Sequence, residues 1–167
     1  MVKAKPHTSG QAMVEFAITL PILILLVAGV LELGRGYVFA IATSDAARDA
    51  TRFVAGKTST TNGPGMVSTC NFVRADLAAI IPNASVSCPT TPVGHAPPFT
   101  AGTDYTAPTA GQAVVAVYCG TSLDCTGSVN TYYGAEVDVY VYYGFSDLNL
   151  LGGGITITGS SRATTSW

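Results

Sequence analysis

The sequence is poor in charge. Only 11% of its residues are Asp, Glu, Lys or Arg, and the net charge is -2. A protein that binds nucleic acid through the phosphates needs clustered Lys and Arg, whereas the basic residues here are few and spread along the chain. The composition therefore argues against a nucleic-acid partner.

Histidine is scarce as well, with His7 near the start of the chain and His95 far from it. A histidine-based zinc site or a Ser-His-Asp triad in the later part of the chain would have to use His95 alone. The spacing of Cys119 and Cys125 is wider than the short C-x2-4-C spacing of zinc ribbons. We therefore expect no metal, no cofactor and no enzymatic activity.

Glu136 and Asp138 are the remaining candidates for acid–base chemistry. They are two residues apart in a predicted strand, so both carboxylates point to the same side of it. Such a pair occurs in hydrolytic sites, but it is more typical of the solvent-facing side of a half-buried sheet. We expect the second of these arrangements.

Against this background, one long apolar run stands out. From Phe16 to Leu31 no residue carries a charge. With its flanks the segment covers residues 14–34, about 20 residues, which is enough to cross a hydrocarbon core of about 30 Å. The run predicts a transmembrane helix in contact with the lipid bilayer.

A short basic head precedes the run. Residues 1–10 include Lys3 and Lys5 and no acid, so the positive-inside rule predicts that this end stays in the cytoplasm. The head is too short for an ordinary secretory signal, which needs its own apolar core. A cut after Gly10 would leave the apolar run on the mature protein.

All of the cysteines follow the run, at positions 70, 88, 119 and 125. An even number on one side of a membrane segment fits disulfides in an oxidising compartment, which supports the same orientation. Three pairings are open. We favour Cys70–Cys88 and Cys119–Cys125, because each joins cysteines that are neighbours in the sequence.

The junction between head and run carries a motif. Gly10 is followed by four residues and then by Glu15 and Phe16, a pattern similar to the processing site of the Flp/Tad branch of type IV pilins. A longer string resembles the TadE-like minor pseudopilins, through Leu20-Pro21, Glu32-Leu-Gly34-Arg35 and Ala46-Ala-Arg48. The resemblance covers roughly residues 10–55.

The resemblance implies a function. A prepilin peptidase would cut between Gly10 and Gln11, and Glu15 would meet the new N-terminal amine of a neighbouring subunit during assembly. The partners would be other pilin or pseudopilin subunits and the inner-membrane assembly machinery of a Flp/Tad-type pilus or secretion system, in assembly or adhesion. The location would be the bacterial cytoplasmic membrane or the surface pili. The position of Glu15 at the edge of the apolar run also fits a simpler role, in which its carboxylate is hydrated among the lipid headgroups.

The chain divides into three parts on this interpretation. Residues 1–10 form a basic leader, residues 11–57 a long helix, and residues 58–167 an extracytoplasmic domain. Beyond the membrane the helix carries an apolar face at helical spacing. The residues of this face are Val38, Ala42, Ala46, Ala50, Phe53 and Val54.

The sequence predicts an α+β fold for the outer domain. Apolar periodicity predicts a short helix over residues 68–81. Strands are expected at residues 84–88, 112–119 and 135–145 and from Ile155 until the pattern fades near residues 160–162. A Pro-rich loop or exposed excursion spans residues 89–111. We expect an antiparallel sheet of three or four strands with the long helix across one face.

One other function fits the same layout. An uncleaved, signal-anchored surface domain could bind a ligand or partner protein through the loop at residues 89–111. It would differ from a pseudopilin in keeping its N-terminus and in having no dependence on pilus machinery.

Overall fold

The computed structural model describes residues 9–57, 66–88, 93–120, 136–146 and 154–164. The basic leader up to residue 8 and Cys125 lie outside the described residues. The chain forms two compact units, residues 1–35 and residues 36–167.

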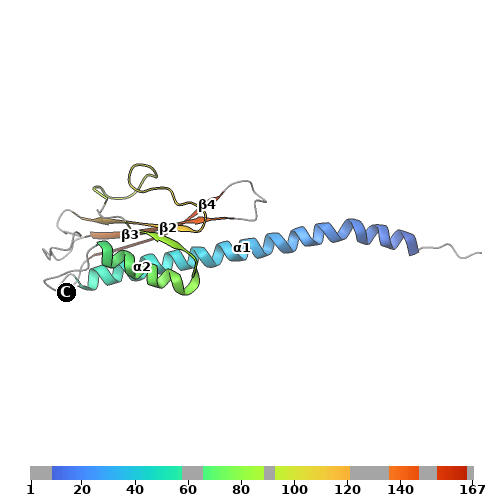
Figure 1. Ribbon diagram of the computed structural model, residues 1–167, viewed down its shortest axis with the longest axis horizontal. Helices are drawn as coiled ribbons and strands as arrows, with labels where there is room; N and C mark the ends of the chain where they lie inside the picture. Colours follow the sequence, from blue (N-terminus) through green and yellow to red (C-terminus); the bar gives the residue numbers. More distant parts are fainter. Residues whose placement is uncertain (1–8, 58–65, 89–92, 121–135, 147–153, 165–167) are drawn as a thin grey trace, which may run out of the picture. The chain divides into compact units, whose positions relative to one another are not determined.

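The elements agree with the expected α+β class, which is confirmed (Figure 1). The helices are α1 (Ser9–Lys57) and α2 (Met66–Ile80). The strands are β1 (Ser85–Ser87), β2 (Gln112–Cys119), β3 (Glu136–Phe145) and β4 (Ile155–Thr164). Strand β4 is longer than expected: it continues through the Ser and Arg residues where the apolar alternation fades, because it pairs with β3 along its whole length.

The sheet has the order β1-β2-β3-β4, and it is mixed. The pairs β2–β3 and β3–β4 are antiparallel, but β1 pairs with β2 in parallel. The expected all-antiparallel sheet is therefore wrong at this edge. Two neighbouring parallel strands need a crossover connection of a dozen or more residues, and the Pro-rich segment between β1 and β2 has that length.

One face of the sheet is covered by the later part of α1 and by α2 (Figure 1). The buried stripe of α1 differs slightly from the predicted one. Val38 is 48% exposed, and Phe39 packs instead, with its ring 5.3 Å from that of Tyr143 and 5.6 Å from that of Phe145. Ala42, Ala46, Ala50 and Val54 are buried as predicted, whereas Phe53 is only partly buried.

Small residues bring α1 unusually close to β4. Gly159 is buried in β4, and a β-carbon at this position would overlap the carbonyl group of Thr43 and lie 2.5 Å from the backbone nitrogen of Ser44. Nearby, the hydroxyl of Thr51 donates to the carbonyl of Ala47 at 2.6 Å and lies 3.4 Å from that of Ser161. Helix and strand backbones therefore meet with no room for a side chain.

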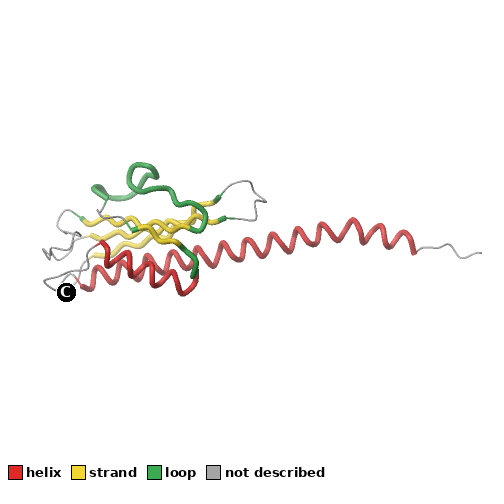
Figure 2. The backbone as a smooth tube through the Cα atoms, viewed as in Figure 1, coloured by secondary structure: helices red, strands yellow, loops and turns green. Residues whose placement is uncertain are grey.

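The other face of the sheet is covered by residues 93–111, which follow β1 and precede β2 (Figure 2). The ring of Tyr105 stacks on that of Tyr142 with centroids 3.8 Å apart. A β-carbon at Gly144 would overlap the carbonyl group of Thr109, so the segment lies directly on β3. The segment is irregular and most of its residues are exposed, as expected, but aromatic and glycine positions of the sheet hold it against this face.

Candidate assembly site at the start of helix α1

Gly10 and Gln11 lie in the first turns of α1. A β-carbon on Gly10 would meet nothing within 4 Å, as at Gly29, Gly34 and Gly36 of the same helix. Packing within the described residues therefore does not require a glycine at this position.

Glu15 is exposed one turn further along the helix. Its Oε1 accepts a hydrogen bond from Nε2 of Gln11 at 3.2 Å, and its backbone carbonyl accepts one from the hydroxyl of Thr19. No basic side chain of the described residues pairs with it. Phe16 is 66% exposed beside it, so both the acid and the aromatic ring are available to a second molecule.

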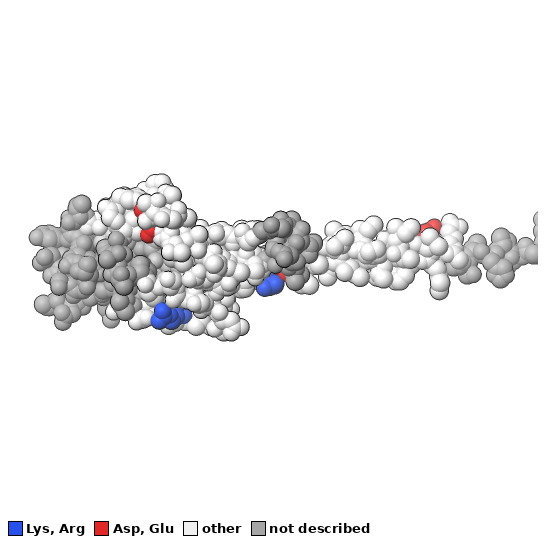
Figure 3. All heavy atoms as spheres, turned by 45° about the horizontal axis from the view of Figure 1, so that its top comes forward, with Lys and Arg blue, Asp and Glu red and all other residues white. Residues whose placement is uncertain are grey.

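The helix surface that follows is apolar and uncovered. The most apolar window of α1 has a mean hydropathy of 2.5 and is 0% buried, and no charged atom is visible along much of this part of the helix (Figure 3). By length and composition this helix can cross a membrane, in agreement with a single-pass membrane protein. The exposed side chains are Met13, Val14, Phe16, Ile18, Leu20, Ile22, Leu23, Ile24, Leu25, Leu26, Val27, Val30 and Leu31.

An ion pair ends the uncharged stretch. Nη1 of Arg35 lies 3.0 Å from Oε1 of Glu32, so the two charges neutralise each other where the chain would leave the bilayer. Sequence reasoning did not pair these residues. The same spacing of three residues occurs in the ion pairs Asp45–Arg48, at 3.9 Å, and Asp49–Arg52, at 3.6 Å.

The carboxylates of Glu136 and Asp138 in β3 both pair with an arginine of the neighbouring strand. Nε of Arg162 lies 2.7 Å from Oδ1 of Asp138 and 2.8 Å from Oε1 of Glu136, and its Nη2 donates to the other oxygen of Asp138 at 3.2 Å. The hydrogen bonds to Asp138, followed by the attraction of both carboxylates, raise the pKa of Arg162. Asp138 is only 1% exposed, so the expectation that it faces solvent is wrong, since a partner on β4 buries it.

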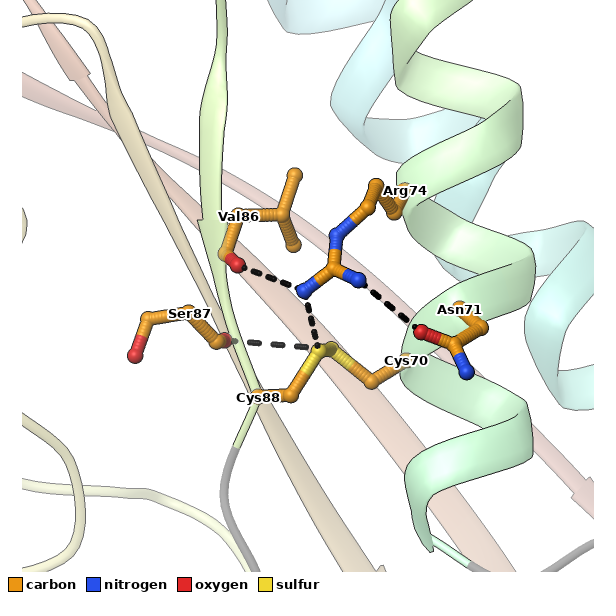
Figure 4. The surroundings of a disulfide bond; sticks show 6 residues. All are labelled: Cys70, Asn71, Arg74, Val86, Ser87 and Cys88. Atoms are coloured by element: carbon orange, nitrogen blue, oxygen red, sulfur yellow. Dashed lines mark hydrogen bonds between the residues drawn. A yellow bond between two sulfur atoms is a disulfide. The ribbon is translucent and has the colours of Figure 1, made fainter.

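The structure joins the first of the two expected cysteine pairs. Cys70 of α2 bonds to Cys88, just after β1, and this disulfide ties the helix to the sheet edge (Figure 4). Arg74 lies across it, donating to the carbonyl of Val86 at 3.1 Å and lying 3.4 Å from the sulfur of Cys88. Cys119 is also disulfide-bonded. Its expected partner, Cys125, lies outside the described residues, so that pairing stays a prediction.

The disulfide leads to a stability prediction. The double variant Cys70→Ser/Cys88→Ser should lose roughly 3 kcal/mol of unfolding free energy, because the bond closes a loop across a sequence separation of 18. Thermal unfolding of the protein in detergent, followed by circular dichroism, measures the loss. An unchanged midpoint, or free thiols at both positions in non-reducing peptide mapping of the wild type, would contradict the pairing.

The single histidine of the outer domain has a defined setting. Nε2 of His95 lies 3.0 Å from Oδ1 of Asp104, and Nδ1 lies 2.8 Å from the carbonyl oxygen of Ala96. A cavity of about 190 Å³ lies between this segment and the sheet, lined in part by Asp104, Tyr105 and Val114. Among the described residues no group of three or more His, Cys, Asp or Glu is placed to hold a metal ion.

These features define a class of protein: an α+β domain following a helix that is long and apolar enough to span a membrane, with a glycine, an acid and an aromatic residue at its start. Residues 10–52 match the model of the TadE-like protein family, which confirms the resemblance over this segment. The match lies within α1 and includes none of the sheet. No curated protein and no solved structure matches the chain.

Proposed function

We propose that this protein is a minor pilin-like (pseudopilin) subunit of a Flp/Tad-type pilus or secretion system. A prepilin peptidase cuts it between Gly10 and Gln11, and the mature subunit acts in pilus assembly. It acts by packing against other subunits and not by catalysis. The N-terminus faces the cytoplasm and the α+β domain lies outside the bacterial inner membrane.

The observation that carries this proposal is the state of Glu15. It is an exposed acid at the beginning of an uncovered apolar helix, with Gln11 as its side-chain partner. On insertion scales an acid at the centre of a bilayer helix costs about 2.5–3.5 kcal/mol, so such a residue needs a partner when the helix is packed. A basic group from a second molecule meets that need.

Cleavage would supply that basic group. Cutting after Gly10 creates a new α-amine on Gln11, which carries a positive charge at neutral pH. The charged amine of one subunit then pairs with the carboxylate of Glu15 in another while their apolar helices pack side by side. The pairing is specific because the segment from Phe16 to Leu31 has no other charge.

Processing is tested at Gly10. Gly10→Val, co-expressed with a prepilin peptidase, should remain uncut and run heavier by the mass of residues 1–10, because a branched side chain replaces a hydrogen at the cut bond. The matched control is Gly29→Val, which changes a glycine of the same helix that also has open space around it and should be cut normally. Blotting after gel electrophoresis measures both. Equal cutting of Gly10→Val and wild type would contradict the assignment.

A further inference from the structure

The Cys70–Cys88 disulfide joins two sulfurs that differ in their access to solvent. Cys70 is 1% exposed and belongs to the hydrophobic core of the α+β domain, whereas Cys88, just after β1, is only partly buried against that core. A reagent that arrives from solvent therefore reaches the sulfur of Cys88 first. The difference matters because a disulfide forms by thiolate attack, which requires access as well as charge.

The guanidinium of Arg74 lies beside the more accessible sulfur (Figure 4). Its Nη2 is 3.4 Å from Sγ of Cys88 and donates to the carbonyl oxygen of Val86 at 3.1 Å, while its Nη1 donates to Oδ1 of Asn71 at 3.0 Å. The contacts with the two oxygen atoms do not need the disulfide. They would keep the guanidinium in place when the two sulfurs are reduced.

Arg74 favours the charged form of Cys88 once the disulfide is open. An arginine side chain is always protonated in proteins, and a cationic neighbour stabilises a thiolate. At 3.4 Å the two groups lie well within the screening length of about 8 Å in physiological salt. Cys88 is therefore the sulfur of this pair that is poised to act as a nucleophile near neutral pH.

The surroundings of Cys70 favour the neutral thiol instead. Its sulfur lies in the core, where burial among apolar side chains disfavours a thiolate. The sulfur also lies 3.8 Å from the carbonyl oxygen of Ser87, which can accept the hydrogen of a thiol. The same oxygen would repel a negative charge on Cys70. The two cysteines are thus unequal in charge as well as in access.

The other charges around the disulfide are directed elsewhere. Strands β1 and β2 contain no Asp, Glu, Lys or Arg. The other charged side chain of α2 is Asp76, whose pKa is raised by burial and then by the charges of Asp49 and Asp45 on α1. In these packed elements Arg74 is therefore the cation that is placed to act on Cys88.

We infer that Cys88 is the sulfur through which this disulfide is made, by exchange with a disulfide of another molecule, and that Arg74 is the positioning residue that holds it as a thiolate. In the first step the Cys88 thiolate attacks one sulfur of the external disulfide. A mixed disulfide forms, the external S–S bond breaks, and its second sulfur leaves as a thiolate.

The second step closes the protein's own bond. Cys70 gives its proton to water and attacks Sγ of Cys88, which releases the first external sulfur as a thiolate. Overall, the two cysteines lose two electrons and two protons, and the external disulfide is reduced to a dithiol when its thiolates take up protons. The contacts of Arg74 join α2 to β1, so this chemistry follows folding and fixes an arrangement that is already present.

The full-length protein in detergent micelles, with glutathione disulfide as the probe, tests this assignment. The variant Cys70→Ser leaves Cys88 as the free thiol of the pair, and Cys88→Ser leaves Cys70. At neutral pH the mixed disulfide should form several-fold faster in Cys70→Ser, and mass spectrometry follows the gain of a glutathione. The pH of half-maximal rate should lie below about 8.5 for Cys88, the value of an ordinary cysteine.

The role of Arg74 is measured in the Cys70→Ser background. Arg74→Gln should move the half-maximal pH upward and slow the reaction at neutral pH several-fold, because the positive charge is lost. Arg74→Lys keeps a positive charge and should stay closer to the parent protein. The matched control is Arg48→Gln, which removes an exposed arginine that pairs with Asp45 on α1 and should leave the half-maximal pH unchanged.

Equal rates for the two cysteines would overturn the assignment. A half-maximal pH that Arg74→Gln leaves unchanged, or that Arg48→Gln raises by as much, would overturn the role of Arg74. Peptide mapping of the reduced wild type, quenched with acid early in the reaction, needs no substitution and decides the matter even where a variant fails to fold. Glutathione should be found on Cys88, and a mixed disulfide mainly on Cys70 would contradict the inference.

Discussion

Glu15→Leu is expected to leave few or no pili on the cells while the protein stays in the membrane at its normal level. Glu15 is exposed on α1, in the first unit of the chain, and contributes nothing to the buried core of the α+β domain. Removing the charge lengthens the apolar run, which favours insertion. Assembly should fail because the amine of the neighbouring subunit then has no carboxylate to meet.

Two further variants separate charge from shape. Glu15→Gln keeps the size of the side chain and removes the charge, so it should match Glu15→Leu. Glu15→Asp keeps the charge with a shorter reach and should give an intermediate number of pili. Pili are counted by electron microscopy beside blots of membrane protein. Normal pili on Glu15→Leu cells would rule out the pairing role, and loss of the protein from the membrane would point to a role in biogenesis.

The second large effect is expected at Gly159. Gly159→Val should destabilise the α+β domain by more than about 3 kcal/mol, at or beyond the upper end of over-packing costs. The reason is that the new side chain would overlap the backbone of Thr43 and Ser44, which cannot move aside as a flexible side chain would. Unfolding in urea, followed by near-ultraviolet circular dichroism, measures the loss.

Gly154→Val is the matched control for this variant. It lies just before the same strand, where a new β-carbon would be 3.6 Å from the carbonyl oxygen of Phe145, an ordinary contact. It should change the unfolding free energy little, within about 0.5 kcal/mol. Similar stabilities for the two variants would show that α1 and β4 do not approach as closely as described.

Much of the fold can be predicted from local patterns. The uncharged run specifies the first part of α1, and the helical spacing of Ala42, Ala46 and Ala50 places its later part on a core. Strand β3 follows from strict alternation: Val137, Val139, Val141 and Tyr143 are all buried on one face, as the pattern predicts. These features depend on residues close together in the sequence, where period and propensity suffice.

The parts that could not be predicted depend on contacts between distant residues. The direction of β1 depends on where the following segment returns to the sheet, and no local pattern records that. The burial of Asp138 requires Arg162, which is 24 residues away on another strand. The sequence predicts a loop for residues 93–111 because their prolines and glycines are typical of loops, whereas their place on the sheet comes from single contacts such as Tyr105 on Tyr142.

In the candidate site, too, part can be predicted from the sequence and part is visible only in the structure. The motif from Gly10 to Phe16 can be recognised in the sequence because it lies between a basic head and an apolar run. The structure adds that Gly10 has open space around it and that Glu15 has no basic partner among the described residues. The second fact favours a site that acts on other molecules, whereas the open space at Gly10 is shared by Gly29, Gly34 and Gly36 and does not distinguish it.

The central claim is that the chain is a pilin-like precursor cut within its first helical turn. The most direct measurement is mass spectrometry of the N-terminal peptide of the protein extracted from membranes of cells that carry pili. The account predicts that the mature chain begins at Gln11. A mature protein that still contains Lys3 and Lys5 would contradict it.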